Sequence, residues 1–416
     1  MNKIERFVYD LVKSNPELKN KIRNIYQSFF DLLPRKTDYS KGDIVIKEGY
    51  FYGFDDLVPI SRNGKYILSN QLTIPLRMPK VDDKLIVGYW DNNLKTYTPI
   101  GETTTWNYHK GCRLQWLGES EDKIIYNCVI DGKLGCCIYS INDKSNRYYT
   151  NPIDSVSPDG RYATSFSYQR LNVYMPGYGY LINDEAYMHE DSSSNTGLFI
   201  LDLNTNKNKL IVSLEELSRF KSEPSMIGAH HYVTHTQFSP DGTRIAFLHR
   251  WTFDDPDKRF TRLITCKIDG TELFASKTSG MVSHFDWDKD NGILAYCQVD
   301  GVDGHYLFTS YEMDDPKRVI TKLNSDGHQS YLPKTSCFIT DTYPDKYRMA
   351  KLYLCDIKTN KCILIASLNS PRKYQSPNLY KHWACDLHPR ISRYNNILTF
   401  DSVHTNIRSF CLINKI

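Results

Sequence analysis

A short turn followed by two strands recurs along the chain, and this repeat limits the possible folds more than any other feature of the sequence. The clearest copy is Phe238-Ser-Pro-Asp-Gly242, which is followed by an apolar strand over residues 243–248 and a second strand over residues 263–268. Pro-Asp-Gly suits a tight turn because proline fixes φ at about −65° and glycine tolerates positive φ. Each copy of the repeat therefore predicts a small antiparallel sheet.

The turn occurs seven times, and the strand that follows the first hairpin occurs seven times as well. The other six turns are Ile60-Ser-Arg-Asn-Gly64, Trp116-Leu-Gly118, Val156-Ser-Pro-Asp-Gly160, Trp287-Asp-Lys-Asp-Asn-Gly292, Leu332-Pro-Lys334 and Ile391-Ser-Arg-Tyr-Asn395. Small sheets repeated in this way are typical of a β-propeller, in which each blade buries its faces against its neighbours. We predict an all-β fold, a seven-bladed β-propeller over residues 43–416. Two stacked β-sandwiches are the alternative, but they would not explain one repeat that runs through the whole chain.

Residues 1–36 follow a different period. Apolar side chains recur every three or four residues over 4–12 and again over 18–33, and Pro16 and Pro34 stand where a helix begins and ends. We predict a short N-terminal α-helical hairpin, which acts either as a cap packed on the propeller or as a docking element for a partner.

Composition excludes several classes of protein. The chain carries 52 Lys and Arg against 48 Asp and Glu, a net charge of +4, which argues against nucleic acid as a partner. We find no run of eighteen apolar residues, so we predict no membrane span. The charged N-terminus does not resemble a secretory signal, and we expect a cytoplasmic protein. The 11 cysteines show no zinc-type spacing, and we expect them to be reduced and mostly buried.

Four histidines share one position in consecutive repeats. His235, His284, His328 and His388 each stand four residues before the turn of their repeat, at Ser239, Asp288, Leu332 and Ser392. In a propeller this position is the end of the innermost strand, opposite the turn, so the four imidazoles are expected around one mouth of the central channel. A single such histidine is usually a hydrogen-bonded core residue. Four in one register predict a metal site instead, with Mn, Fe, Zn or Ni as candidate ions.

Other polar residues are expected at the same mouth. Asp386 precedes His388 by two residues and therefore points the same way on a strand, as a carboxylate ligand. The strand after the fourth turn ends at His249 and Arg250. Two long insertions, 168–195 and 213–231, are predicted on this side, and the first holds Arg170, Tyr178 and Tyr180. Loops of this length usually serve a function, and a lid rich in Tyr and Arg suits an anionic sugar.

These segments resemble a known family. Thr234-His-Thr-Gln-Phe-Ser-Pro-Asp-Gly242, Ser283-His-Phe-Asp-Trp287, His328-Gln-Ser-Tyr331 and Cys385-Asp-Leu-His-Pro-Arg390 look like oligogalacturonate lyase and related seven-bladed polysaccharide lyases. The likeness covers mainly residues 100–416. It implies a divalent metal, manganese first, and β-elimination on a uronate-containing oligosaccharide or polysaccharide.

The resemblance also implies particular ligands. His284 and His388 match metal ligands of the family, and Asp386 stands where the family has a second histidine. Trp383 stands where the family has a glutamine ligand, and tryptophan does not bind metal. Either His328 or His382 would have to fill that place, or the site has changed.

β-Elimination needs a neutralised carboxylate, a base for the C5 proton and a donor for the leaving oxygen. The base candidates are His235, His249, Arg170 and Arg250, of which an arginine would need an unusually low pKa. The donor candidates are Tyr178 and Tyr180. The sequence leaves the choice among them open.

Two other functions compete with a lyase. A non-catalytic propeller would bind a glycan or a protein through the same mouth, and the altered metal ligands favour it. Glycoside hydrolysis by paired carboxylates would draw on the acidic stretch that contains Asp184, Glu185, Glu190 and Asp191, although such a cluster is more often a solvated loop. The sequence shows no nucleophile elbow, zinc-protease helix, phosphate loop or dinucleotide fingerprint.

Overall fold

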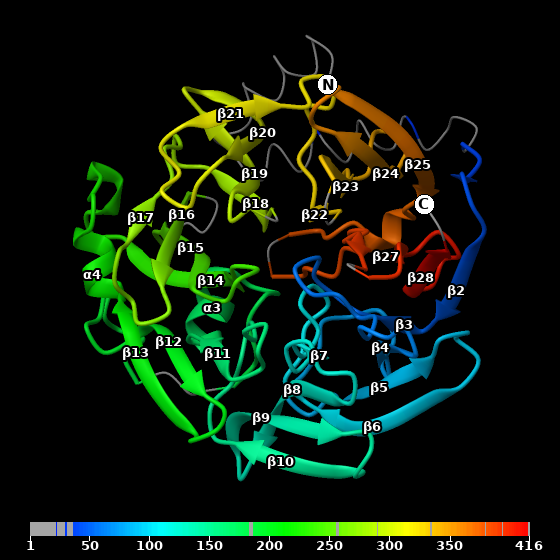
Figure 1. Ribbon diagram of the computed structural model, residues 1–416, viewed down its shortest axis with the longest axis horizontal. Coiled ribbons are helices and arrows are strands. Elements are labelled where there is room, and N and C mark those ends of the chain that lie inside the picture. The colour runs from blue at the N-terminus through cyan, green and yellow to red at the C-terminus, as the bar shows by residue number, and fades with distance from the viewer. Residues whose placement is uncertain are drawn as a thin grey trace.

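Seven small antiparallel sheets are arranged in a ring, as the repeat predicts (Figure 1). The computed structural model describes Ile22, Phe30 and residues 36–182, 186–254, 258–288, 290–332, 335–378, 380–392 and 394–414. The prediction of a seven-bladed β-propeller is therefore confirmed. The predicted N-terminal helical hairpin lies outside the described residues, apart from Ile22 and Phe30.

The first four blades follow one another along the chain, and each is built from consecutive strands. Blade 1 contains β3 (Tyr50–Phe51), β4 (Tyr66–Gln71), β5 (Leu85–Asp91) and β6 (Tyr97–Thr103). Blade 2 contains β7 (Gln115–Trp116), β8 (Lys123–Ile130), β9 (Lys133–Ser140) and β10 (Ser145–Tyr149). Blade 3 contains β11 (Tyr162–Ser165), β12 (Gly197–Asp202) and β13 (Lys207–Ser213). Blade 4 contains β14 (His230–Phe238), β15 (Arg244–Thr252), β16 (Arg259–Lys267) and β17 (Phe274–Ala275).

The last two blades take their outermost strands from the beginning of the chain, which closes the ring. Blade 5 contains β18 (Val282–Trp287), β19 (Ile293–Val299), β20 (Val302–Phe308) and β21 (Pro316–Val319). Blade 6 contains β22 (Gln329–Tyr331), β23 (Cys337–Asp341), β24 (Met349–Asp356), β25 (Lys361–Asn369) and β1 (Tyr39–Ser40). Blade 7 contains β26 (Arg390–Ile391), β27 (Ile397–Ser402), β28 (Ser409–Asn414) and β2 (Ile44–Glu48). Because β2 pairs with β28, hydrogen bonds between the two ends of the propeller hold the first and last blades together.

The Pro-Asp-Gly turns have the geometry that their sequence predicts. In blade 4 the N–H of Gly242 donates to the Ser239 carbonyl at 2.8 Å, and the Ser239 hydroxyl donates to Asp241 at 2.6 Å. Gly242 has a φ of 72°, in the left-handed region that favours glycine. This turn joins the innermost strand to the second strand, so it fixes which end of the innermost strand carries the histidine.

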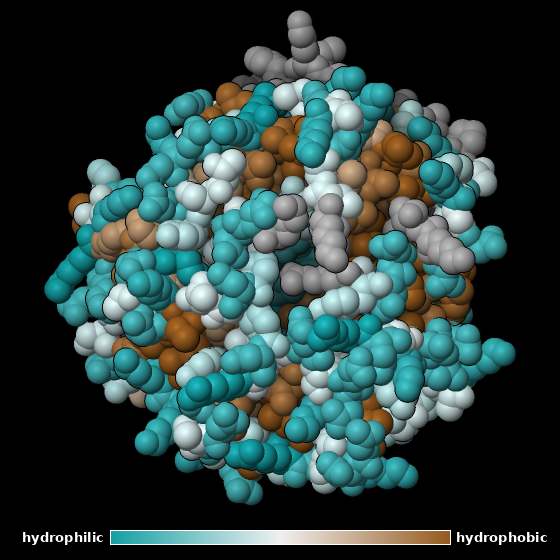
Figure 2. All heavy atoms as spheres, in the orientation of Figure 1, coloured by the Kyte–Doolittle hydropathy of each residue, from teal (hydrophilic) through white to brown (hydrophobic). Residues whose placement is uncertain are grey.

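Packing between blades explains why the inner strands are apolar on both faces. All nine residues of β15 are buried. Ile245 and Phe247 contribute to a core shared with blade 3, whereas Ala246 and Leu248 contribute to a core shared with blade 5. Figure 2 shows the opposite property at the surface, where hydrophilic residues dominate and hydrophobic ones are visible only in separate patches.

Both long insertions contain helices. The first begins with α3 (Tyr168–Tyr174), capped by the Ser167 hydroxyl, and the second contains α4 (Leu214–Arg219) and the 3₁₀ helix η1 (Pro224–Met226). A second 3₁₀ helix, η2 (Arg372–Tyr374), follows β25. Figure 1 shows α3 near the centre of the ring and α4 at its rim. Within the part of the chain that the structure describes, no helix has the length and apolar character needed to cross a membrane.

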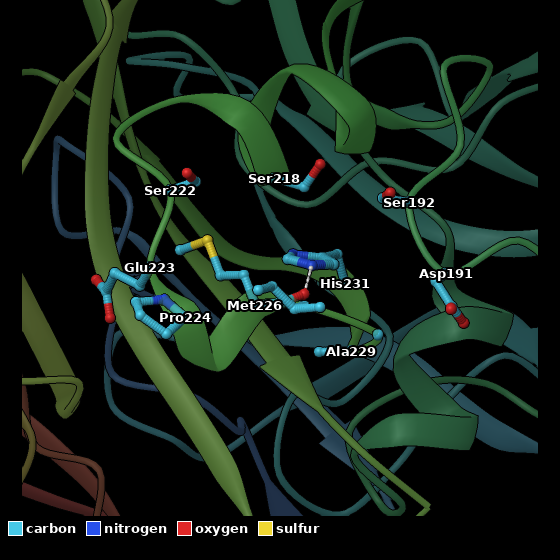
Figure 3. Close-up of a pocket in the computed structure, with 11 residues that line it drawn as sticks. Asp191, Ser192, Ser218, Ser222, Glu223, Pro224, Met226, Ala229 and His231 are labelled. Atoms are coloured by element: carbon cyan, nitrogen blue, oxygen red, sulfur yellow. Dashed lines mark hydrogen bonds between the residues drawn. The ribbon is translucent and has the colours of Figure 1, made fainter.

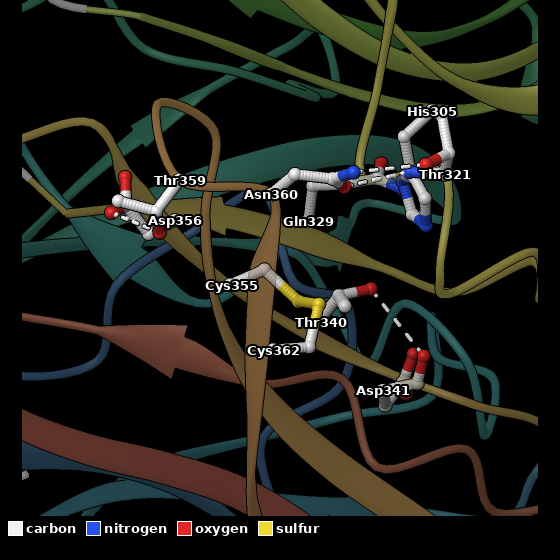
Figure 4. The surroundings of a disulfide bond; sticks show 10 residues. All are labelled: His305, Thr321, Gln329, Thr340, Asp341, Cys355, Asp356, Thr359, Asn360 and Cys362. Carbon is white, nitrogen blue, oxygen red and sulfur yellow. Dashed lines mark hydrogen bonds between the residues drawn. A yellow bond between two sulfur atoms is a disulfide. The ribbon is translucent and has the colours of Figure 1, made fainter.

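The cysteine prediction needs one correction. Cys355 and Cys362 form a disulfide between directly opposite residues of β24 and β25, with their Cα atoms 4.1 Å apart (Figure 4). The pairing of these strands could not be inferred from cysteine spacing. The other nine cysteines are free, and all but Cys337 are buried, as expected.

Candidate metal centre at the channel mouth

The four histidines of the shared register meet around one aromatic ring, which comes from blade 1. The ring of Phe54 lies 4.7 Å from that of His235, 5.1 Å from His388, 5.7 Å from His328 and 6.0 Å from His284, measured between centroids. The rings of His284 and His328 are 4.0 Å apart, and those of His328 and His388 are 4.2 Å apart. The structure therefore brings these four predicted site residues together.

Two of these histidines occupy an unusual backbone conformation. His235 has a φ of 54° and His388 a φ of 44°, both in the left-handed region. In β14 the register shifts between Thr234 and Gln237, so His235 lies in a bulge. Residues other than glycine adopt such conformations at a cost, and they are concentrated at functional sites. The bulge turns the imidazole out of the ladder and toward the channel.

Buried carboxylates hold this backbone in place. Asp341, at the end of β23, accepts the N–H of His328 at 2.7 Å and the N–H of His388 at 3.0 Å. It also lies 3.0 Å from Nδ1 of His328. Although burial alone would lower the pKa of His328, the negative charge and hydrogen bonds of Asp341 raise it to about 10. With Nδ1 bonded to Asp341, Nε2 is the ring atom that remains for another partner.

Three buried polar atoms at this mouth have no hydrogen-bond partner. They are Oδ1 of Asp55, Nδ1 of His109 and Nε2 of His388. Orphaned buried atoms of this kind are rare, and one explanation for them is a bound ion. The three residues belong to two groups whose ligand atoms all lie within 4.8 Å of one another, Asp55 with His328 and His388, and His109 with Asp386 and His388.

We call Asp55, His109, His328, Asp386 and His388 the donor set. Imidazole nitrogens combined with carboxylate oxygens suit divalent transition metals, including manganese and zinc. The orphaned atoms are the ones that would coordinate, so the residues present fit such an ion. His388 belongs to both groups and is the central donor.

Burial controls the protonation of four residues of the donor set, all except His328. It raises the pKa of Asp55 to about 8 and that of Asp386 to about 6, and it lowers the pKa values of His109 and His388 well below their usual range. The imidazoles of His109 and His388 are therefore neutral at pH 7, which is the form that binds metal, whereas Asp341 favours the protonated form of His328.

The sequence missed His109, Asp55 and Phe54. His109 lies in the segment before β7, where the repeat is degenerate, and Asp55 lies in an irregular segment of blade 1. Nδ1 of His109 is 4.0 Å from Oδ2 of Asp386, and its Nε2 contacts Nδ1 of His382. His382 thus contacts the donor set through His109, and no positional signal in the repeat would have selected His109.

His284, a predicted ligand, and Trp383, at the family's glutamine position, both lie outside the donor set. His284 contacts His328, but its Nδ1 faces Asp326 at 3.4 Å. Trp383 donates its indole N–H to the carbonyl of Lys373 at 3.0 Å, so it forms part of the fold of the blade-7 loop. The two carboxylates and three imidazoles of the donor set come from other positions of the chain.

Of two further predicted residues, Tyr178 contacts the donor set and Arg250 contacts Met175, whose carbonyl accepts the N–H of Tyr178. The ring of Tyr178 stacks on His109, with centroids 4.5 Å apart, and lies 6.3 Å from the ring of His235. Arg250 is buried, and its Nη1 contacts the sulfur of Met175 at 3.0 Å. Burial, and then the charge of Arg259, lower the pKa of Arg250 to about 10.

Arg170 and Tyr180, two of the predicted catalytic residues, make contacts that stabilise the first insertion. Arg170 donates to the carbonyls of His231 and Glu190, at 3.3 and 3.0 Å. Tyr180 stacks on Tyr168 and accepts a hydrogen bond from Asn127 at 3.1 Å. Both side chains are buried in these contacts, and neither is in a ring contact with the four histidines.

His249 is also placed apart from the four histidines. Its Nδ1 accepts from Nε of Arg262 at 3.1 Å, and its Nε2 lies 2.9 Å from Nδ1 of His231. This series of hydrogen bonds ends at the carbonyl of Met226, 3.3 Å from Nε2 of His231. Because Arg262 donates to one nitrogen of His249 and His231 occupies the other, the expectation that His249 borders the channel mouth is corrected: it supports the second insertion.

His231 and Met226, at the end of these hydrogen bonds, line a cavity of about 510 Å³ (Figure 3). The cavity lies between the two insertions, and its walls include Asp191, Ser218, Glu223 and His231. Oδ1 of Asp191 lies 2.7 Å from Nδ1 of His230, and Asp184 and Glu185 lie outside the described residues. The described part of the acidic stretch therefore offers no pair of free, facing carboxylates for glycoside hydrolysis.

Comparison with known proteins identifies the fold. No protein-family model matches the sequence, and no curated protein matches it. A solved structure of an oligogalacturonate lyase in complex with manganese matches with a TM-score of 0.64 at 14% identity, covering 92% of this chain and 97% of that one. An oligogalacturonate lyase from Vibrio parahaemolyticus matches with a TM-score of 0.60 at 12% identity, covering 90% and 98%. In fold, this chain is similar to the oligogalacturonate lyases, as the resemblance in its sequence implies.

Proposed function

We propose that the protein is a divalent-metal-dependent lyase that cleaves uronate-containing oligosaccharides by β-elimination. The observation that carries the proposal is the donor set, whose orphaned nitrogen and oxygen atoms converge on His388 at one channel mouth. The fold likeness to enzymes named oligogalacturonate lyase, one of them in complex with manganese, supports the same reading. Fold alone does not determine activity, so the site carries the argument.

Either group of the donor set would hold the ion: His109, Asp386 and His388, or Asp55, His328 and His388. When bound, the ion supplies positive charge that neutralises a uronate carboxylate and makes the neighbouring C5 proton more acidic. Asp341 and Asp326 orient His328 and His284 from behind, as carboxylates commonly do for histidine ligands.

The protein's own residues supply the proton transfers. His235 is the proposed base, because its ring packs against Phe54 with the other three histidines and lies 6.3 Å from the ring of Tyr178, and burial keeps the imidazole neutral. Its Nδ1 lies 2.9 Å from the hydroxyl of Thr234, so Nε2 is the atom that accepts the C5 proton. The electron pair of the C–H bond forms the C4–C5 double bond as the C4–O bond breaks. Tyr178, kept protonated by burial, is the proposed donor to the leaving oxygen.

The test combines metal content with turnover. Protein purified without a metal-affinity tag should contain about one divalent ion per chain, and with manganese it should release unsaturated uronate ends from oligogalacturonate, which absorb in the ultraviolet. His388→Ala should lose both properties. His189→Ala is the matched control, because His189 is exposed and lies outside the donor set. Metal-free protein that stays inactive with added manganese would overturn the proposal.

The second candidate is a non-catalytic propeller that binds an acidic glycan. Trp383 favours it, since tryptophan stands where the lyases that the sequence resembles have a glutamine ligand. Binding of oligogalacturonate by metal-loaded protein without any unsaturated product would select this function instead.

A further inference from the structure

The cavity of about 510 Å³ between the two insertions is separate from the donor set, none of whose residues lines it (Figure 3). Its volume falls within the range of about 300–1,000 Å³ that is typical of small-molecule sites. Among the described residues, its polar lining comes from both insertions and consists of Asp191, Ser192, Ser218, Ser222, Glu223 and His231. The proposed lyase reaction uses none of these side chains.

His231 presents a hydrogen-bond donor to this cavity, because buried neighbours fix its tautomer. Burial keeps two histidines neutral, since it lowers the pKa of His231 to about 4 and that of His249 well below its usual range. Nε of Arg262 always carries a hydrogen and donates to Nδ1 of His249 at 3.1 Å. The proton of His249 is therefore on Nε2, which donates to Nδ1 of His231 at 2.9 Å. The proton of His231 is then on Nε2, 3.3 Å from the carbonyl of Met226, another residue of the lining (Figure 3).

The direction of these hydrogen bonds argues against nucleophilic catalysis by the serines of the cavity. A serine nucleophile needs an imidazole that accepts its proton, with a carboxylate on the other ring nitrogen. His231 has an imidazole and then a guanidinium behind it, so it donates where a base would accept. The hydroxyl of Ser218 already donates to the carbonyl of Glu215 at 2.8 Å. The cavity is therefore suited to binding a ligand and not to reacting with it.

The charges around the cavity favour a neutral ligand with hydroxyl groups. Among the described residues of the lining, Asp191 and Glu223 are acidic and none is Lys or Arg, so an anion would be repelled. A cation would meet the N–H of His231, with the charge of Arg262 behind it. A hydroxyl group suits both kinds of partner, because it donates to a carboxylate and accepts from an imidazole N–H or a serine.

Apolar side chains complete the lining and match the ring of a sugar. They are Pro224, Met226, Ile227 and Ala229. Ile227 is 80% exposed, the highest value for a large apolar side chain among the described residues. A hexose ring combines an apolar C–H face with hydroxyls at its edge, and small-molecule sites commonly combine apolar walls with a few polar groups in this way.

We propose that the cavity between the insertions is a second binding site, which takes a neutral hexose and needs no metal. Glu223 and Asp191 accept hydroxyl groups of the sugar, and Nε2 of His231 donates to one of its oxygens. Because Asp191 belongs to the first insertion and Glu223 to the second, the bound sugar joins the two insertions. This inference goes beyond the proposed function and does not depend on it.

Binding to metal-free protein tests the site apart from the donor set. The probes are glucose, galactose and mannose, each compared with its uronate, and nuclear magnetic resonance titration of protein dialysed against a chelator measures the affinities. We expect at least one hexose to bind with a Kd of about 1 mM and its uronate at least about 10-fold more weakly.

Two variants and a control place the binding. Ser222→Trp fills the cavity from an exposed position and should abolish binding, whereas Glu223→Gln keeps the shape of the side chain and should weaken binding about 5-fold or more. Glu215→Gln is the matched control, because Glu215 lies in α4, pairs with Arg219 and does not line the cavity. Near-ultraviolet circular dichroism checks that the variants are folded.

The outcomes separate this site from the lyase reaction. If the wild type binds none of the three hexoses, or if binding survives Ser222→Trp, the proposal is wrong. Tighter binding of a uronate than of its hexose by the metal-free protein also overturns it. Hexose binding that is lost in Ser222→Trp and kept in His388→Ala supports the second site, whether or not the protein forms unsaturated products.

Discussion

Nδ1 of His328 lies 3.0 Å from Oδ1 of Asp341, and the other oxygen of the same carboxylate accepts the backbone N–H of His388. One buried side chain thus orients an imidazole of blade 6 and fixes the strained backbone of blade 7. The two blades meet at the donor set, so Asp341 is a positioning residue for both histidines.

Asp341→Asn should weaken manganese binding by about 10- to 100-fold, because residues behind the ligands tune metal affinity by this amount. The amide keeps the shape of the side chain but loses the charge that holds the two histidines. Titration with manganese measures the affinity, and near-ultraviolet circular dichroism checks that the packing is kept. Asp315→Asn, at an exposed position of blade 5, should bind as the wild type does. Unchanged affinity in Asp341→Asn would remove its positioning role.

Asp154 anchors a buried ion network in the channel. It lies 2.7 Å from Nζ of Lys110 and 3.0 Å from Nε of Arg113, and it accepts the N–H of Thr236, next to His235. Although burial alone would raise the pKa of Asp154, the two cations lower it below its usual range. Asp154→Asn should cost about 3–5 kcal/mol of unfolding free energy at pH 7, because it leaves Lys110 and Arg113 without their shared partner.

The cost of Asp154→Asn should depend on pH with a definite sign. Since folding lowers the pKa of Asp154, its contribution is complete above the unfolded pKa of about 3.9 and is lost as the pH falls below that value. Urea unfolding of wild type and variant at pH 7 and at about pH 3 measures the difference, which should shrink in acid. Asp202→Asn, which breaks a surface ion pair with Arg161, serves as the control. A difference that stays constant with pH contradicts the assignment.

The sequence predicts the ring and its histidines because both follow from a local period. His235 and His388 are found by counting back from their turns, and the seven turns give the blades. Phe54 and Asp55 cannot be found by counting back from a turn, because their position depends on a distant contact. Asp401 accepts the N–H groups of Tyr52 and Gly53, almost 350 residues earlier in the chain. Contacts of this kind are set by ring closure and leave no local pattern.

The disulfide illustrates the same limit. Cys355 and Cys362 become neighbours only once β24 and β25 pair in the observed register. Reduction should lower the unfolding free energy by about 2 kcal/mol, because the bond closes a short loop in the unfolded chain. Urea unfolding with and without reductant measures the change. The Cys355→Ser/Cys362→Ser double variant should show the lower stability and no response to reductant, whereas an equal response in both proteins would assign the effect to another cysteine.

Phe54 should determine whether the four histidines stay together. Its ring contacts all four and is 5% exposed, so Phe54→Ala leaves a cavity at the centre of the group and should cost about 3–5 kcal/mol of unfolding free energy. Phe54→Leu fills most of the volume and should cost much less. Because the imidazoles in Phe54→Ala lose the surface against which they pack, its manganese affinity should fall further than that of Phe54→Leu. Urea unfolding and manganese titration of both variants distinguish a role of Phe54 in the metal site from a role in stability alone. If Phe54→Ala loses stability but binds manganese as the wild type does, the donor set is organised by Asp341 and Asp401 alone.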